Sequence, residues 1–258
     1  MEPLNPIIFV GAGPGDPELI TVKGQKALAE ADVILYAGSL VSPTMLQWAR
    51  PEAENIDTAS LDLRAITGRM IQAHRAGKRV VRLQTGDLSL YSAMQEQVEE
   101  LDQAEVPYQV IPGVTAASGV SAALGQEFTL PELTQTVILT RAAGRTPVPA
   151  EEELSKLASH KATMVIYLSV QMIDSLVEKL IPAYGPEAPV VVGYRISWPD
   201  EKIVQGSLAT IAEQVRQAGI NRQAVIVVSP ALAARQQHLG KRSKLYDSQF
   251  SHGYREGQ

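Results

Sequence analysis

The chain has 258 residues, of which 45% are hydrophobic and 20% charged, and its formal net charge is −5. A chain of this composition can bury one large core or two modest ones, and its acidic balance gives no overall field to attract nucleic acid. The absence of cysteine excludes disulfides, thiolate nucleophiles and cysteine-ligated metals, and no apolar run approaches the roughly 20 residues that span a bilayer.

The first element in chain order is a strand at residues 7–10, which runs into the loop GAGPGDP and then into a helix. Gly11, Gly13 and Gly15 permit positive φ angles and close approach of a ligand to the backbone. The spacing G-x-G-x-G, with Asp16-Pro17 after it, does not match the fingerprint of a dinucleotide-binding turn. A cofactor loop and a tight structural turn both remain consistent with this segment.

Strands are also predicted at residues 33–36, 79–83 and 108–111, where β-branched residues are frequent, with helices at 61–76 and 90–104 between them. Two of these strands end in further glycine-bearing corners, QTGDLSLY at residues 84–91 and IPGVTAA at residues 111–117. Each corner alone is explained by a turn glycine and a capping Asp87 or Thr115. If the strands are parallel, however, all three corners meet at one sheet edge, which favours a binding site.

A second series of strands is predicted at residues 136–140, 163–168, 190–194 and 224–228, separated by helices at 151–159, 170–180 and 208–218. Near-continuous apolar strands indicate sheets that are covered on both faces. We therefore expect two α/β domains, one at residues 1–132 and one at 133–232, joined where the helical pattern stops near Pro131. Residues 233–258 are predicted to form a polar surface tail.

The second half offers two candidate ligand segments. TRAAGRTPVP places Arg141 and Arg145 on one loop, where they could hold carboxylates or could simply be solvated. YRISWPDE combines an arginine, a tryptophan and acids around a proline turn, where Trp198 could flank a planar ligand or fill a gap in the core. The four histidines lack the spacing of zinc ligands, so no metal site is predicted.

Taken together, GAGPGDPELIT, LYAGSLV, TGDLSLY, PGVTAA, TQTVILTRAAGRTPVP and SWPDE resemble segments of the tetrapyrrole methyltransferases of corrin synthesis. The resemblance spans residue 7 to about residue 232. LYAGSLV, TRAAGRTPVP and SWPDE look specifically like the subgroup that methylates C11 of precorrin-4 or cobalt-precorrin-4 in cobalamin biosynthesis.

The resemblance implies two α/β/α domains of the tetrapyrrole methylase type, with the active site in the cleft between them. It also implies a homodimer, an anionic tetrapyrrole substrate, and S-adenosylmethionine (SAM) as methyl donor, with S-adenosylhomocysteine (SAH) as product. Composition and charge separately predict a cytoplasmic protein with no nucleic-acid or membrane partner. The cofactor contacts carried over from the resemblance are Pro14, Thr85, Gly86, Asp87, Leu90, Thr115, Ala116, Leu168, Tyr194, Arg195 and Ala224. Asp16, Arg141 and Arg145, with Arg195, are expected on the substrate side.

Several alternatives stay open on the sequence. The shared corners identify the cofactor and not the substrate, so a sibling enzyme that methylates another ring carbon or uroporphyrinogen also fits. A ribosomal RNA methyltransferase is disfavoured by the acidic balance, and a nucleotide-dependent oxidoreductase by the glycine spacing. A non-catalytic tetrapyrrole carrier would bind the macrocycle without SAM. The presence of cobalt in the ring is not decided by these residues, although the likeness favours the cobalt form.

Overall fold

The computed structural model describes residues 5–234, 240 and 243–256, and the chain forms two compact units. Unit 1 comprises the residues up to Gly119 together with Arg195–Asp200, and unit 2 comprises Val120–Tyr194 and the chain from Glu201 onward. This division differs from the expected boundary between residues 132 and 133. The join falls within helix α4 (Ala116–Leu124), and the short segment 195–200 packs with unit 1 although its flanking strands belong to unit 2.

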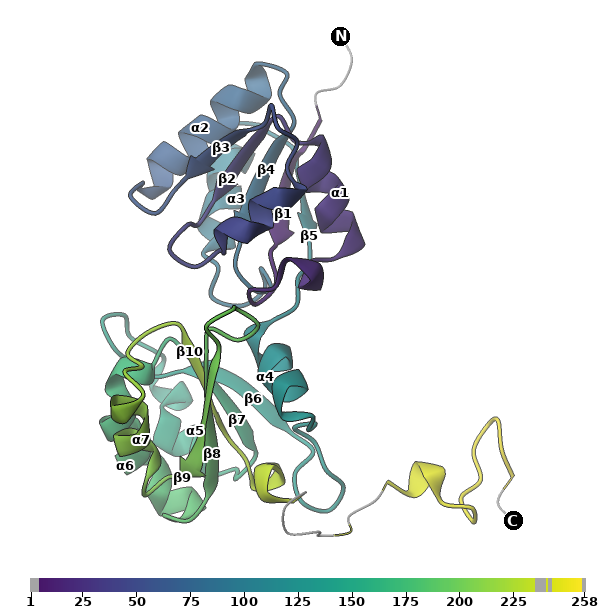
Figure 1. Ribbon diagram of the computed structural model, residues 1–258, viewed down its shortest axis with the longest axis vertical. Helices are drawn as coiled ribbons and strands as arrows, with labels where there is room; N and C mark the ends of the chain where they lie inside the picture. The colour runs from purple at the N-terminus through teal and green to yellow at the C-terminus, as the bar shows by residue number, and fades with distance from the viewer. Residues whose placement is uncertain (1–4, 235–239, 241–242, 257–258) are drawn as a thin grey trace. The chain divides into compact units, whose positions relative to one another are not determined.

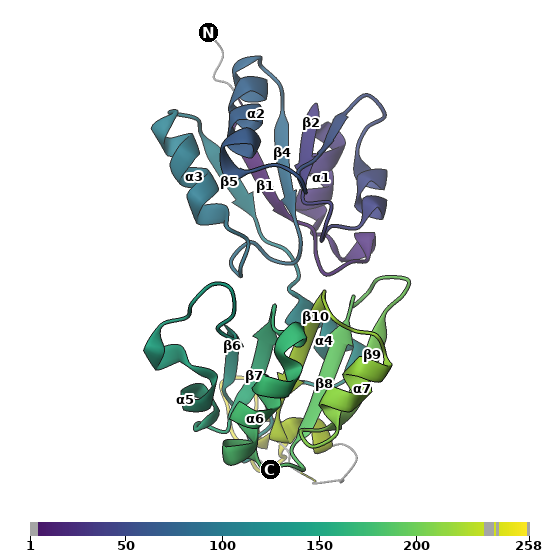
Figure 2. The same ribbon diagram turned by 90° about the vertical axis from the view of Figure 1, so that its left-hand side faces the viewer.

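Unit 1 is built on a parallel sheet with the strand order β3-β2-β4-β1-β5 (Figures 1 and 2). Its strands are β1 (Ile7–Gly11), β2 (Val33–Tyr36), β3 (Glu54–Asp57), β4 (Val80–Gln84) and β5 (Tyr108–Ile111). Because all five strands are parallel, their carboxyl ends lie along one edge of the sheet. The strands β4, β1 and β5 are immediate neighbours there.

Helices cover both faces of the unit 1 sheet. Helix α1 (Val22–Glu30) and the 3-10 helix η2 (Pro43–Trp48) pack on the face that presents Val10 and Ile34. Helices α2 (Leu63–Arg75) and α3 (Met94–Gln103) pack on the face that presents Phe9 and Leu35 (Figure 2). Each of these side chains stabilises the fold by about 1.5–3 kcal/mol when it is fully buried. Packing on both faces therefore holds the edge of the sheet in place.

A buried arginine lies in the middle of this sheet. Arg82 of β4 is 4% exposed, and its Nε donates to Gln97 Oε1 (2.8 Å) while Nη1 donates to Thr58 Oγ1 (3.1 Å). Within the described residues, none of its hydrogen-bond partners is a carboxylate. Burial without a counter-charge lowers the pKa of Arg82 to about 10. The arginine thus joins strand β4 to helix α3 and to the turn after β3.

Unit 2 contains a mixed sheet with the strand order β6-β7-β10-β8-β9 (Figure 1). Its strands are β6 (Val137–Arg141), β7 (Thr163–Tyr167), β8 (Pro189–Tyr194), β9 (Lys202–Ser207) and β10 (Ala224–Val228). Strands β6 and β7 are parallel, whereas β10 runs antiparallel to β7 and β8, and β8 and β9 form an antiparallel pair. The fold class is therefore α/β in both units, as the sequence predicts.

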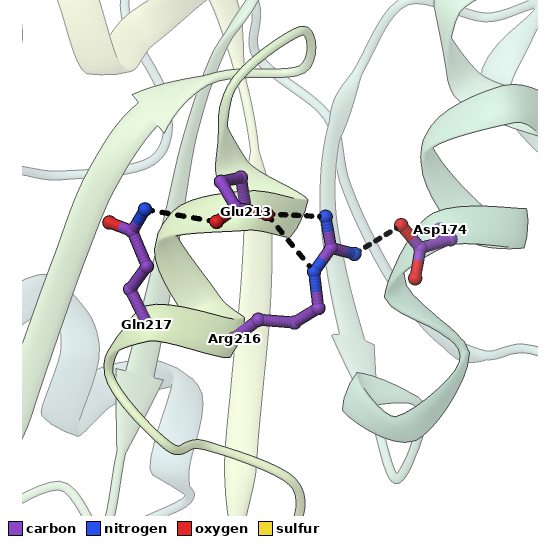
Figure 3. Close-up of polar contacts among 4 residues, drawn as sticks. All are labelled: Asp174, Glu213, Arg216 and Gln217. Carbon is purple, nitrogen blue, oxygen red and sulfur yellow. Dashed lines mark hydrogen bonds and ion pairs between the residues drawn. The ribbon is translucent and has the colours of Figure 1, made fainter.

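Three helices cover one face of the unit 2 sheet, namely α5 (Leu154–Ala158), α6 (Ile173–Tyr184) and α7 (Ile211–Gln217). Helices α6 and α7 are also linked at the surface (Figure 3). Arg216 donates to Asp174 Oδ1 (2.6 Å) and to Glu213 Oε2 (2.8 Å), and the Gln217 amide donates to Glu213 Oε1 (2.9 Å). Hydrogen bonds from Arg216 and then Gln217 lower the pKa of Glu213. Because these groups are exposed, salt is expected to screen the link.

The remaining short elements are 3-10 helices: η1 (Pro17–Leu19), η3 (Ala150–Glu152), η4 (Val170–Met172), η5 (Pro230–Ala233) and η6 (Lys244–Tyr246). The predicted polar tail at residues 233–258 is described in part, since residues 235–239, 241–242 and 257–258 lie outside the described residues. In its described part, Arg255 donates to Leu245 O (2.8 Å) and Asp247 O (2.5 Å). A search of the described residues finds no helix long and apolar enough to span a membrane.

Two strands, β3 and β9, are absent from the sequence prediction. Both lie at a sheet edge, and all their residues are exposed or half-buried. An edge strand with polar residues such as Glu54, Asn55 and Asp57 carries no apolar pattern by which it could be found.

Candidate functional site

The three glycine-bearing corners of unit 1 meet at the carboxyl ends of β4, β1 and β5. Gly13 and Gly86 form an antiparallel bridge, in which Gly86 N donates to Gly13 O (2.8 Å) and Gly13 N donates to Gly86 O (3.2 Å). Ala12 N donates to Gln84 O (2.7 Å) just below this bridge. The convergence predicted from the sequence is thereby confirmed.

Glycine is required in these corners mainly because the backbones touch. A Cβ on Gly113 would lie 2.2 Å from Gly86 O, and a Cβ on Gly11 would lie 2.6 Å from Gly113 N. Gly86 differs, since its φ is +64° and a Cβ there would meet nothing within 4 Å. The corner is thus closed between its three loops and open beside Gly86, where a bound molecule can approach the backbone.

Asp87 ties two of the corners together. Its Oδ2 accepts from Gly113 N (2.8 Å), and its Oδ1 accepts from Ser89 N (2.9 Å) and from the Ser89 hydroxyl. Partial burial raises the pKa of Asp87, but the hydrogen bonds from the Ser89 hydroxyl, Gly113 N and Ser89 N outweigh burial and lower the pKa overall. Asp87 is therefore an anion that accepts hydrogen bonds at both oxygens.

Four other predicted cofactor residues of unit 1 lie next to this corner. Thr85 directly follows β4, and Leu90 N donates to Asp87 O (3.4 Å) in the same turn. Thr115 and Ala116 lie where the third corner enters α4, and Thr115 O accepts from Gly119 N (3.3 Å). All four are half-buried, which leaves part of each side chain accessible to a ligand.

The first loop, Pro14–Asp16, is held by groups on both sides. Asp16 Oδ1 accepts from Glu18 N (2.8 Å) and so caps the 3-10 helix η1, while Asp16 N donates to Ser197 Oγ (2.9 Å). Trp198 Nε1 donates to Pro14 O (2.9 Å). The structure thus gives Asp16, predicted on the substrate side, a capping role with one carboxylate oxygen.

Arg195 belongs to the same group of contacts. Its guanidinium carbon lies 3.9 Å from the centre of the Trp198 ring, and its Nε forms an ion pair with Asp200 Oδ1 (2.8 Å). Arg195 therefore supports Trp198, a contact that the sequence did not reveal. The sequence also gives no sign that the φ angles of Arg195 and Ser197 lie in the left-handed region.

Unit 2 has its own pocket, which brings together three predicted residues. Arg141, Arg145 and Leu168 line a cavity of about 560 Å³, together with Ala142, Gly144, Thr146, Gln171 and Met172. The two arginines differ within it. Arg141 donates to Thr146 O (3.1 Å) and Pro147 O (2.6 Å) and so braces its own loop, whereas Arg145 is exposed and has no partner among the described residues.

Ser169, which contacts Ala142 in the lining of this pocket, was not identified from the sequence. Its hydroxyl is fully buried, accepts from Ala142 N (2.8 Å) and donates to Tyr167 O (2.6 Å). It follows Leu168, which is 66% exposed with φ +55°, so the buried serine fixes a turn that presents an apolar side chain to solvent. A small polar residue two positions after a largely buried strand is the signal that could have identified it.

Tyr194 and Ala224, the remaining predicted cofactor residues, are cross-strand partners on β8 and β10. Tyr194 is half-buried and Ala224 is 7% exposed. Neither lines the arginine pocket of unit 2. A search of the described residues for clusters of at least three histidines, cysteines or acids finds no group that could hold a metal ion.

Comparison with known proteins gives a consistent result. The family model described as tetrapyrrole (corrin/porphyrin) methylases matches residues 6–212. The chain is 49% identical to a cobalt-precorrin-4 C(11)-methyltransferase of Methanocaldococcus jannaschii, covering 99% of this chain and 98% of that protein. It is 46% identical to a precorrin-4 C(11)-methyltransferase of Pseudomonas aeruginosa, covering 98% and 99%.

Two solved structures extend the comparison. An X-ray structure of a cobalt-precorrin-4 methyltransferase, described as a cobalamin biosynthetic enzyme, superposes with a TM-score of 0.85 at 46% identity, covering 88% of this chain and 95% of that one. A uroporphyrin-III C-methyltransferase of Thermus thermophilus, solved with S-adenosylhomocysteine, gives a TM-score of 0.71 at 28% identity, covering 88% and 93%.

Proposed function

Because the chain belongs to the tetrapyrrole (corrin/porphyrin) methylase family, we propose that it transfers a methyl group from SAM to C11 of cobalt-precorrin-4 in cobalamin biosynthesis. The observation that carries the proposal is the interlocked glycine corner, found in a chain that matches C11-methyltransferases over nearly its full length. Relatives named for the metal-free substrate are almost as similar, so precorrin-4 is the second substrate to test.

The residues of unit 1 fit the cofactor. The open side of the corner at Gly86, with Thr85 and Leu90 half-buried beside it, gives a ligand access to backbone groups. We assign Pro14, Thr85, Gly86, Asp87, Leu90, Thr115 and Ala116 to the cofactor, and Asp87 acts there by holding the Gly113 backbone. From the rest of the chain, the proposal keeps Leu168, Tyr194, Arg195 and Ala224 as cofactor contacts.

The proposed methyl transfer requires no strong acid or base from the protein. When bound, SAM would supply an electrophilic methyl on its sulfonium and would leave as the thioether SAH, while the macrocycle would supply the electron pair of the new bond at C11. The protein's task is to align the reacting groups and to exclude water. A rigid corner of backbone amides and carbonyls suits that task, because it binds without rearranging.

The arginine pocket of unit 2 is proposed to hold a peripheral carboxylate of the substrate. Arg145 is exposed and free to bind an anion, and Arg141 shapes the loop that presents it. Asp16 stays proposed on the substrate side through its second carboxylate oxygen. A local positive pocket reconciles an anionic substrate with a net charge of −5.

Arg145→Ala is expected to weaken tetrapyrrole binding about tenfold, because a charge-assisted hydrogen bond is lost, and to leave SAH affinity and thermal stability unchanged. Titration of each ligand by calorimetry measures this. Arg222→Ala removes another exposed arginine of unit 2 and serves as the matched control. Equal loss of both ligands in Arg145→Ala, or the same substrate loss in the control, contradicts the assignment.

The proposed reaction is tested by incubating the protein with methyl-labelled SAM and either cobalt-precorrin-4 or precorrin-4, followed by mass spectrometry. We expect one added methyl on cobalt-precorrin-4, located at C11 by fragmentation or NMR. Methylation of another carbon would identify a sibling activity, and methylation of precorrin-4 alone would move the enzyme to the metal-free route. Failure to bind SAM would reject the methyltransferase function.

We further propose that the protein acts as a homodimer, as its resemblance to the family implies, and that it is cytoplasmic. The cysteine-free composition suits a reducing compartment. Light scattering on the eluting protein should give twice the chain mass of 27.8 kDa, and a single-chain mass would reject the dimer.

A further inference from the structure

The chain has two tryptophans, and both donate their indole N–H to the first glycine loop and the residues after it. Trp198 Nε1 donates to Pro14 O (2.9 Å), and Trp48 Nε1 donates to Pro17 O (3.1 Å). Trp48 comes from η2, whereas Trp198 comes from the segment 195–200. Two bulky donors from distant parts of the chain thus act on adjacent turns.

The Trp198 contact is part of a larger fit to Pro14–Asp16. A Cβ on Gly15 would lie 2.2 Å from Trp198 Cδ1, so the ring packs directly on the glycine backbone. The neighbouring Ser197 hydroxyl accepts from Asp16 N (2.9 Å). Every residue of the turn Pro14–Asp16 is therefore contacted by the segment that carries Trp198.

The segment itself adopts an unfavourable backbone to make these contacts. Arg195 and Ser197 have φ angles of +45° and +64°, which non-glycine residues rarely adopt. Such conformations persist only where the surroundings enforce them, and they concentrate at functional sites. Here Ile196, which is 4% exposed and packs against Gly119, and the stacking of Arg195 on the Trp198 ring enforce the turn.

We propose that Trp198 is a positioning residue, which holds Pro14–Asp16 in the conformation that binds the cofactor. The inference rests on the proposed cofactor role of Pro14. Trp198 donates a hydrogen bond to the Pro14 carbonyl and fills the space over Gly15, and these two contacts restrict the loop to a single conformation. Ligand binding therefore does not incur the entropic cost of ordering the loop.

Trp48 supplies the matched control, because it makes the same type of bond three residues further along. Pro17 begins η1, which is already fixed by the Asp16 cap and by the bond from Leu19 N to Asp16 O (3.0 Å). No residue of η1 is assigned to the cofactor. The two substitutions Trp198→Phe and Trp48→Phe remove the same donor and keep an aromatic ring.

The experiment measures SAH binding by calorimetry and amide hydrogen exchange of Gly13, Gly15 and Asp16 in the full chain. Trp198→Phe is expected to weaken SAH binding about fivefold to tenfold and to speed exchange in the loop about tenfold. Trp48→Phe is expected to change SAH affinity less than about twofold. Thermal midpoints are measured for both variants, since a purely structural role of Trp198 would lower the midpoint of Trp198→Phe without a selective loss of SAH affinity.

Equal loss of SAH affinity in the two variants, or unchanged affinity and exchange in Trp198→Phe, would overturn the proposal. If Trp198→Phe does not fold, Ser197→Ala replaces it and is expected to weaken SAH binding about threefold through the freed Asp16 amide. An unchanged affinity in that variant counts against the proposal. If the unmodified protein binds no SAH, the proposed function fails, while the exchange rates still decide whether Trp198 orders the loop.

Discussion

Replacing Gly113 with alanine is expected to destabilise the protein by about 3 kcal/mol and to reduce SAH affinity more than tenfold. The added Cβ would lie 2.2 Å from Gly86 O and 2.8 Å from Gly11 Cα, both of which are backbone atoms that a side-chain rotation cannot move. The clash would push the three corners apart at the place where the cofactor is proposed to bind. Denaturant unfolding and calorimetric titration with SAH measure the two effects.

Alanine substitutions of two other glycines give reference values for the stability effect of Gly113→Ala. Gly68 lies on the exposed side of α2 with nothing within 4 Å of an added Cβ, so Gly68→Ala should stabilise the protein by about 0.5–1 kcal/mol. Gly86 has open space but a φ of +64°, so Gly86→Ala should cost about 1–2 kcal/mol. A Gly113→Ala variant that is no less stable than Gly86→Ala would show that the loops can separate freely.

Replacing Asp87 with asparagine should cost about 2 kcal/mol at neutral pH and weaken SAH binding. An amide has one acceptor oxygen, so it cannot replace a carboxylate that accepts from Gly113 N at one oxygen and from Ser89 at the other. Its NH₂ group would face a backbone or hydroxyl donor instead. The third corner would then lose its link to the second.

The pH dependence of this substitution follows from the lowered pKa of Asp87. A carboxyl group whose pKa falls on folding adds stability above its unfolded pKa of about 3.9, and that stability is lost as the pH falls through the folded value. The difference in unfolding free energy between the unmodified protein and Asp87→Asn should therefore be complete at about pH 7 and shrink below about pH 4. Urea unfolding at several pH values measures it.

Asp102→Asn is the matched control, since Asp102 is an exposed aspartate of α3 in the same unit. Its substitution should change stability by less than about 0.5 kcal/mol at either pH. A pH-independent loss in Asp87→Asn would mean that the carboxylate charge contributes nothing, and the tie between the corners would then depend on shape alone.

The placement of the corner could be predicted from the sequence, because it depends on local signals. Each loop follows a buried strand and contains glycine, and parallel strands bring such loops to one edge. The prediction of strands near residues 7–10, 33–36, 79–83 and 108–111 was therefore enough to bring Pro14, Gly86 and Thr115 into one region. Arg141 and Arg145 were predicted on one loop, whereas their common pocket with Leu168 is seen only in the structure.

What the sequence could not supply are contacts between distant residues. The Asp87 bond to Gly113 spans 26 positions, and the Trp198 bond to Pro14 spans 184. The packing of residues 195–200 with unit 1 likewise depends on tertiary structure, as does the buried Arg82, whose charge gives no sign of a position in the middle of a sheet. Propensity and periodicity describe neighbours along the chain and carry no information of this kind.

The placement of both tryptophans beside one loop also gives the protein a built-in optical reporter. Indole emission depends on the polarity and hydrogen bonding of its surroundings, and here every indole in the chain donates to Pro14 or Pro17. Ultraviolet-excited fluorescence selected for tryptophan therefore reports on this short stretch of backbone rather than on the molecule as a whole. Each single phenylalanine variant keeps one tryptophan, either Trp198 at Pro14 or Trp48 at Pro17. Ligand binding can therefore be followed at each of the two positions separately, without an added dye.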